Sequence, residues 1–156
     1  MTALAASVRT VRCVRLELAG VLQGVGFRPY VSGLARSLGI KGWVANSESG
    51  VLLEAEGPAA AVAAFVRRLG AELPPHAGID ALKQTDVEPR GHAAFRIRDS
   101  IAGTQGQTAF VTPDIASCAD CVAEIFDPSN RRFQYPFTSC TQCGPRFSII
   151  ETLPFD

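Results

Sequence analysis

A glycine-rich loop between an apparent strand and an apparent helix most constrains what this chain can form. Residues 20–28 read Gly-Val-Leu-Gln-Gly-Val-Gly-Phe-Arg. Glycine lets backbone N–H groups turn inward without a Cβ clash, and a following helix offers unpaired N–H groups and the positive end of its dipole. Arg28 adds a guanidinium fork that matches pairs of phosphate oxygens. The segment predicts an oxyanion or phosphate cradle, and a purely structural glycine turn is the alternative.

The hydrophobic patterns on both sides of this loop predict an α+β unit. Residues 12–18 alternate between apolar and polar, which indicates a half-buried strand, and apolar residues at helical spacing run from Phe27 to Leu38. The remaining expected elements are strands at 43–45 and 51–55, a helix at 58–69, and strands at 81–87 and 94–98. This βαββαβ order, with an additional short strand, is ferredoxin-like and predicts an antiparallel sheet with two helices on one face.

Three local expectations follow from the same patterns. Residues 46–50, Asn-Ser-Glu-Ser-Gly, are expected to form a hairpin turn. Phe95 and Ile97 are expected to face the core from the last strand. His76 and His92 lie in connections rich in proline and glycine, so we expect both at the surface without a chemical role.

Four of the five cysteines form two CxxC pairs, Cys118 with Cys121 and Cys140 with Cys143. Two such pairs can close a tetrahedral thiolate site, and this predicts a structural metal. Zinc is favoured, iron in a rubredoxin-like site is the main rival, and disulfide or redox roles are less favoured. A segment this small buries little apolar surface, so metal binding would supply its folding free energy. Cys13 lies in a strand-like run and is expected to be a small core residue.

Aromatic and basic side chains surround the cysteine pairs. We expect the aromatic residues to pack around the metal site, and an aromatic nucleic-acid platform is the alternative; these residues are Phe126, Phe133, Tyr135 and Phe137. The basic residues would contact a neighbouring domain or be solvated; these are Arg131, Arg132 and Arg146.

Size and charge narrow the classes of function. A chain of 156 residues is enough for one ordinary domain or two small ones. Its formal net charge is +0, and the slightly basic first part carries too small an excess to indicate nucleic-acid binding. Residues 50–57 also lack the aromatic side chains of an RNA-binding strand. No apolar run approaches the ~20 residues of a membrane span, and no signal peptide is recognisable, so a cytoplasmic location is expected.

Two motifs in the first part of the chain resemble those of the acylphosphatases. The first is Val-x-Gln-Gly-Val-x-Phe-Arg at 21–28, and the second is Gly-Trp-Val-Ala-Asn at 42–46, followed by Gly50 and Glu-Gly at 56–57. The resemblance covers residues 10–98. It implies that Arg28 holds the phosphoryl group of an acyl phosphate and that Asn46 positions the attacking water. It also implies a cradle of backbone amides from Gln23, Gly24, Val25, Gly26 and Phe27. Phosphoryl transfer needs charge stabilisation and alignment more than a strong base.

The cysteine-containing segment resembles the first zinc finger of HypF, the carbamoyltransferase family of [NiFe]-hydrogenase maturation. The likeness rests on Cys-Ala-Asp-Cys at 118–121, Tyr-Pro-Phe at 135–137 and Cys-Thr-Gln-Cys-Gly-Pro-Arg at 140–146. It implies an acylphosphatase-like domain (10–98), a linker (99–113) and a zinc finger (114–156). The family carries a second finger and further domains, which use ATP and Mg²⁺, so we interpret the chain as a fragment.

The resemblance also implies a function. In this family the first domain hydrolyses carbamoyl phosphate to carbamate and phosphate, as the first step of carbamoyl transfer to HypE for cyanide-ligand synthesis. The alternative is a non-catalytic module that binds phosphate and docks other domains. Neither interpretation involves nucleic acid or a membrane.

Overall fold

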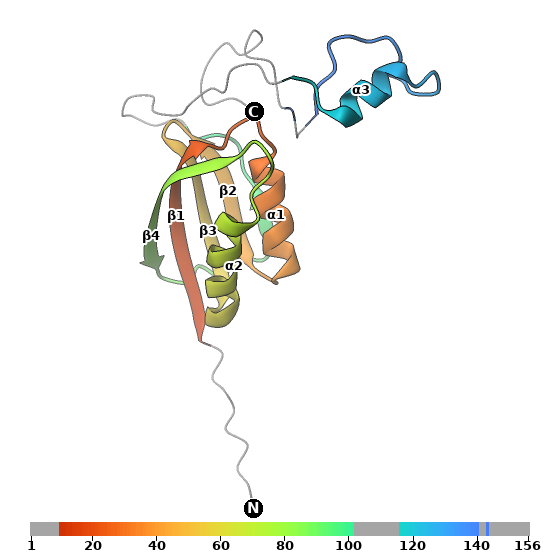
Figure 1. Cartoon of the computed structure of the whole chain (residues 1–156). Helices are drawn as coiled ribbons and strands as arrows, with labels where there is room; N and C mark the ends of the chain where they lie inside the picture. The colour runs from red at the N-terminus through yellow and green to blue at the C-terminus, as the bar shows by residue number, and fades with distance from the viewer. Residues whose placement is uncertain (1–9, 102–115, 141–142, 144–156) are drawn as a thin grey trace, which may run out of the picture.

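The computed structural model describes residues 10–101, 116–140 and 143. Its elements, in chain order, are β1 (Val11–Val21), α1 (Phe27–Ser37), β2 (Lys41–Ser47), β3 (Gly50–Pro58), α2 (Ala59–Ala71), β4 (Gly78–Val87), β5 (Phe95–Ile97) and α3 (Ala119–Phe126). The elements from β1 to β5 follow the βαββαβ order with an additional short strand, as predicted (Figure 1). No helix of the described part is long and apolar enough to cross a membrane.

The first five strands form one mixed sheet in the order β4-β1-β3-β2-β5. Neighbours among β1 to β4 are antiparallel, as predicted, but β5 runs parallel to β2. Strand directions explain this difference. β4 ends at the end of the sheet where β2 begins, and residues 88–94 carry the chain across that end to the β2 edge. A strand that enters there must run parallel to β2, and a three-residue run has too short a pattern to reveal its partner.

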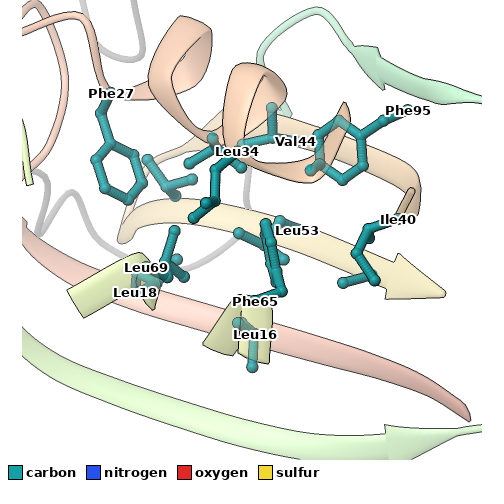
Figure 2. Close-up of a cluster of buried hydrophobic side chains, with 14 of the residues drawn as sticks. Leu16, Leu18, Phe27, Leu34, Ile40, Val44, Leu53, Phe65, Leu69 and Phe95 are labelled. Carbon is teal, nitrogen blue, oxygen red and sulfur yellow. The ribbon is translucent and has the colours of Figure 1, made fainter. Parts of the chain in front are cut away.

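Both α1 and α2 lie on one face of the sheet and enclose the core (Figure 1). Leu34 of α1, Leu53 of β3 and Phe65 of α2 point toward one another in this layer, as Figure 2 shows. Phe95 is buried as predicted; Ile97 pairs with the buried Val44 and so lies on the predicted face of the sheet, but it is 47% exposed instead of buried. Ile97 lies where β5 ends at the sheet edge, and it lines an open hollow rather than the core.

The hairpin between β2 and β3 is tighter than predicted. Asn46 and Ser47 belong to β2, and Gly50 begins β3, so only residues 48–49 form the turn. Asn46 pairs with Val51 in the ladder and is 1% exposed. The prediction of a hairpin turn within residues 46–50 is correct, but both strands extend into this segment farther than their apolar pattern indicates.

The face of the sheet opposite the helices carries a buried polar cluster around Glu54, which is 1% exposed. Its carboxylate accepts hydrogen bonds from Arg15 (2.6 and 3.1 Å) and from the indole N–H of Trp43 (3.1 Å). Nε2 of His92 lies 3.2 Å from Glu54 Oε2, and Nε of Arg90 lies 3.6 Å from it. We call these five residues the Glu54 cluster. The surface prediction for His92 was therefore wrong.

Other side chains follow the predictions more closely. His76 is exposed. Cys13 in β1 is 1% exposed, in agreement with its predicted core position. Ile101 pairs with Ser47 beyond the end of β5, and residues 102–113 of the predicted linker lie outside the described residues. The division into two domains and a linker stays a prediction.

Candidate anion site and metal centre

The glycine-rich loop joins β1 to α1 and forms the start of the helix. Gly24 and Gly26 have φ values of 75° and 74°, a left-handed conformation that side-chain-bearing residues rarely adopt. Gly26 is the N-cap of α1, and its carbonyl accepts the first helical hydrogen bond, from Tyr30. Among the described residues no side chain caps this helix start, and its first turn has no acidic residue. The helix N–H groups and dipole are therefore available to an anion at this place.

Gln23 connects the loop to the β2–β3 hairpin. Its side chain is 3% exposed, and Nε2 donates to the carbonyl oxygens of Ser47 (2.9 Å) and Gly50 (3.0 Å). Ser47 directly follows Asn46, so this contact holds the loop beside the strand end that carries Asn46. The two motifs found in the sequence thus meet in space through Gln23, whose side chain binds the hairpin.

Arg28 is the second residue of α1 and is half-buried. It lines an open hollow of about 300 Å³ together with Pro29, Ile97, Arg98 and Asp99. The hollow lies between the start of α1 and the end of β5. Arg98 also belongs to its lining, and this residue lies outside both sequence motifs.

The four cysteines of the second segment converge as predicted. Cys118 is the N-cap of α3 and Cys121 lies in its first turn, so the helix start sets the spacing of the first pair. The Sγ atoms of all four cysteines lie within 4.8 Å of one another. Sγ of Cys118 lies 3.5 Å from that of Cys140, and Sγ of Cys121 lies 3.8 Å from that of Cys143.

These separations fit a metal bound by four thiolates. A tetrahedral site with metal–sulfur bonds of about 2.3 Å has sulfur–sulfur edges of about 3.8 Å. Burial raises the pKa of Cys121 to about 12, and the neighbouring thiols add to the rise. Burial also opposes ionisation of Cys143, but hydrogen bonds from backbone N–H groups and neighbouring thiols outweigh it and lower the pKa of Cys143 to about 7. A bound cation is therefore what makes all four thiolates at once. All four are free of disulfides, so the donor set suits a structural metal.

The aromatic residues near the cysteines do not pack as predicted. Phe126 is 74% exposed and Phe137 is 80% exposed, while Tyr135 and Phe133 are 52% and 41% exposed. The rings of Tyr135 and Phe137 contact each other, with centroids 5.9 Å apart. Among the described residues of this segment, the buried ones are Cys121, Cys143 and Thr138 instead, because a four-thiolate site leaves little interior for rings. Arg131 is exposed, Arg132 pairs with Glu124, and Arg146 lies outside the described residues.

Family comparisons match both parts of the chain. The family model described as Acylphosphatase matches residues 14–97, and the model described as HypF finger matches residues 118–150. An acylphosphatase of Thermotoga petrophila is 34% identical over 88 residues, which are 56% of this chain and 97% of that protein.

Longer relatives match almost the whole chain. The carbamoyltransferase HypF2 of Cupriavidus necator is 45% identical over 149 residues, which are 95% of this chain and 18% of that protein. A crystal structure of full-length HypF in the phosphate- and nucleotide-bound form superposes with a TM-score of 0.89 and 38% identity, over 97% of this chain and 20% of that one. The chain thus spans about a fifth of the length of these relatives.

Proposed function

Because the chain belongs to the acylphosphatase family over residues 14–97, we propose that it hydrolyses an acyl phosphate at the loop before α1. The observation that carries this proposal is the coupling of Gln23 to the β2–β3 hairpin. It places an anion-receptive loop and helix start beside the strand end that carries Asn46. A phosphate cradle and a water-positioning amide are the two parts that such a hydrolysis requires.

Each residue has a distinct part in the proposed mechanism. Backbone N–H groups of residues 23–27 and the guanidinium of Arg28 bind the phosphoryl oxygens and stabilise the charge that builds on them. The Asn46 side chain orients a water molecule in line with the bond that breaks. The water oxygen forms a bond to phosphorus, and the bond between phosphorus and the acyl oxygen breaks. The products are inorganic phosphate and the carboxylate or carbamate, and the proton of the water passes to solvent or to product.

The HypF relatives suggest the substrate and the context. We propose carbamoyl phosphate as the substrate, and hydrogenase maturation with transfer toward HypE as the pathway to which the hydrolysis contributes. Those relatives are about five times longer than this chain, so adenylation with ATP and Mg²⁺ and the transfer step are assigned to the rest of such a protein. A cytoplasmic location stays a prediction.

Steady-state hydrolysis of carbamoyl phosphate and benzoyl phosphate tests the proposal. Arg28→Ala should lower kcat/KM at least about 100-fold, the usual cost of one lost charge-stabilising donor. Asn46→Ala should lower kcat by a similar factor and change KM little. Arg36→Ala is the matched control, because it removes an exposed arginine from the last turn of the same helix. Equal rates for Arg28→Ala and Arg36→Ala, or phosphate binding by the wild type without turnover, contradict the proposal.

We propose zinc as the metal of the four cysteines. Its role is structural, because four protein ligands leave no open position on a tetrahedral ion. Elemental analysis of the purified chain should give about one zinc per chain, and Cys121→Ser should lower this content. Iron in place of zinc would contradict the choice of metal, and wild-type content for Cys121→Ser would contradict the site.

A further inference from the structure

A second cationic hollow lies at the β5 edge of the sheet, on the side away from the helices. It has a volume of about 190 Å³, and its lining consists of Gly42, His92, Ala93, Ala94, Arg96 and Arg98. Arg96 lies in β5 and Arg98 directly follows its end; because the two residues are two apart along a chain that stays paired with β2, their side chains leave the same face. Backbone pairing continues through this region, because Arg98 N–H donates to the carbonyl oxygen of Val44 (2.8 Å).

Of the basic residues that line this hollow, His92 pairs with the Glu54 carboxylate, whereas the side chains of Arg96 and Arg98 have no carboxylate partner among the described residues. None of the residues that line it is a carboxylate. The side chain of Arg96 forms no ion pair or hydrogen bond with the described residues, and it is exposed. The side-chain contact of Arg98 is with the Trp43 ring, over which its guanidinium carbon lies 4.7 Å from the centroid. Two guanidinium groups and an imidazole therefore face one small space.

The Glu54 cluster holds two of these three groups in place. Trp43, beneath Arg98, is 6% exposed and its indole N–H is bonded to Glu54. His92 contacts the same carboxylate oxygen through Nε2, over 3.2 Å. Ordering long side chains is a main cost of binding, and a stacked guanidinium loses less freedom than a free one. The hollow is therefore organised before any ligand arrives.

We propose that this hollow is a second anion site, which binds one phosphate group of a small molecule. A volume of about 190 Å³ is below the ~300–1,000 Å³ of pockets that enclose whole drug-sized ligands. It suits a single tetrahedral oxyanion with a few waters. Arg98 lines both this hollow and the one beside Arg28, so the two anion sites are neighbours. The inference rests on this geometry alone and does not depend on the proposed hydrolysis.

Trp43 provides a direct measurement, because it is the single tryptophan of the chain and lies under Arg98. Titration of the whole chain with inorganic phosphate, at constant ionic strength set with sodium chloride, should change the Trp43 fluorescence saturably. The change should persist in Arg28→Ala, and Arg96→Gln should weaken it at least tenfold. Arg67→Gln is the control, because Arg67 is an exposed arginine on α2 and its loss should leave the titration unchanged.

A parallel titration with carbamoyl phosphate, in the inactive Arg28→Ala background, distinguishes the source of the phosphate group. Tighter binding of carbamoyl phosphate than of inorganic phosphate identifies a substrate subsite, and equal or weaker binding identifies a site for released phosphate. The Arg96→Gln variant should unfold at the wild-type temperature, since the exposed Arg96 side chain has no ion pair or hydrogen bond to lose among the described residues. Three outcomes overturn the inference: a fluorescence change lost in Arg28→Ala, equal binding by Arg96→Gln and Arg67→Gln, or the same response to chloride alone.

Discussion

The side-chain nitrogen of Gln23 lies 2.9 Å from the carbonyl oxygen of Ser47 and donates a hydrogen bond to it. The same nitrogen donates to Gly50 across 3.0 Å. One buried amide thus uses both of its N–H groups to hold the two strands of a hairpin and the loop before α1 together. The geometry of the candidate phosphate site depends on this contact, since the loop and Asn46 come from separate parts of the sheet.

Gln23→Glu tests that dependence with almost no change in shape. The carboxylate cannot donate, and it would face two carbonyl oxygens at a buried position. We expect the free energy of unfolding to fall by about 1–3 kcal/mol, the usual cost of a buried polar group without its partners. Urea denaturation measures this loss. Hydrolysis of carbamoyl phosphate should fall as well, because the added negative charge repels phosphate.

Gln84→Glu is the matched control for this change. Gln84 is exposed on β4, so the same substitution there should alter stability by less than about 0.5 kcal/mol. If the two variants lose equal stability, the Gln23 contact does not hold the loop to the hairpin.

The sequence predicts the elements of this fold better than their edges. The alternation of residues 12–18 and the helical spacing after Phe27 depend on burial of one face, and burial is a local pattern. Asn46 lies in β2 rather than in the turn because pairing with Val51 extends the strand. Such pairing cannot be predicted from the type of residue alone. The direction of β5 depends on where β4 leaves the sheet, which is a property of the whole topology.

The same distinction applies to the sites. Paired motifs predicted Arg28 and Asn46 as site residues and the four cysteines as a cluster, because each motif is a short run of specific residues; the structure brings the cysteines together, and the roles of Arg28 and Asn46 stay predictions. His92 and Glu54 are 38 residues apart, and their contact exists only across the sheet. The pattern Arg-x-Arg at 96–98 is present in the sequence. That the two arginines line one hollow follows only from the structure, which shows the face of the sheet on which their side chains lie.

Gly42→Ala and Gly33→Ala should change the stability of the fold in opposite directions. Gly42 has a φ of 136°, and a Cβ there would lie 2.0 Å from the backbone oxygen of Glu54. We expect its alanine variant to be severely destabilised or unfolded, because the backbone of β3 cannot move away. Gly33 lies within α1, where an added Cβ would have nothing within 4 Å among the described residues. Alanine at this position should therefore stabilise the chain by about 0.5–1 kcal/mol.

Thermal unfolding of both glycine variants measures the contrast. A Gly42→Ala chain as stable as the wild type would show that β2 and β3 are not paired in this register.

Glu54→Gln should reduce the acid sensitivity of the fold. Burial alone would raise the pKa of Glu54, but hydrogen bonds from Arg15, Trp43 and His92 outweigh it and hold the pKa below its ordinary value. A carboxyl with a lowered pKa stabilises the fold above its unfolded pKa of about 4.3, and this contribution is lost as the pH falls through the folded value. Glutamine removes that contribution, so the variant should be less stable at pH 7.

Unfolding free energies of the two proteins should converge as the pH falls from 7 to 3, with the steeper decline in the wild type. Glu17→Gln is the control, because Glu17 forms an exposed pair with Lys83 at 3.3 Å and should change the profile little. Parallel pH profiles of Glu54→Gln and the wild type would show that Glu54 carries no such linkage.

Reaction with a thiol reagent at pH 8 should separate the five cysteines into two classes. The metal-loaded chain should react slowly or not at all. After removal of the metal with a strong chelator, Cys118, Cys121, Cys140 and Cys143 should react, because the segment then loses the folding free energy that the metal supplies and its thiols become exposed. Cys13 should react only after denaturation, since burial raises its pKa to about 11, with Glu54 and Glu56 adding to the rise. A buried thiol with this pKa is almost fully protonated at pH 8, and the thiolate is the reactive form.

Cys13→Ala is the control. It should lower the number of thiols that react in denaturant from five to four, and the number that react after chelation should stay at four. Five thiols reacting together after chelation would place Cys13 outside the folded sheet.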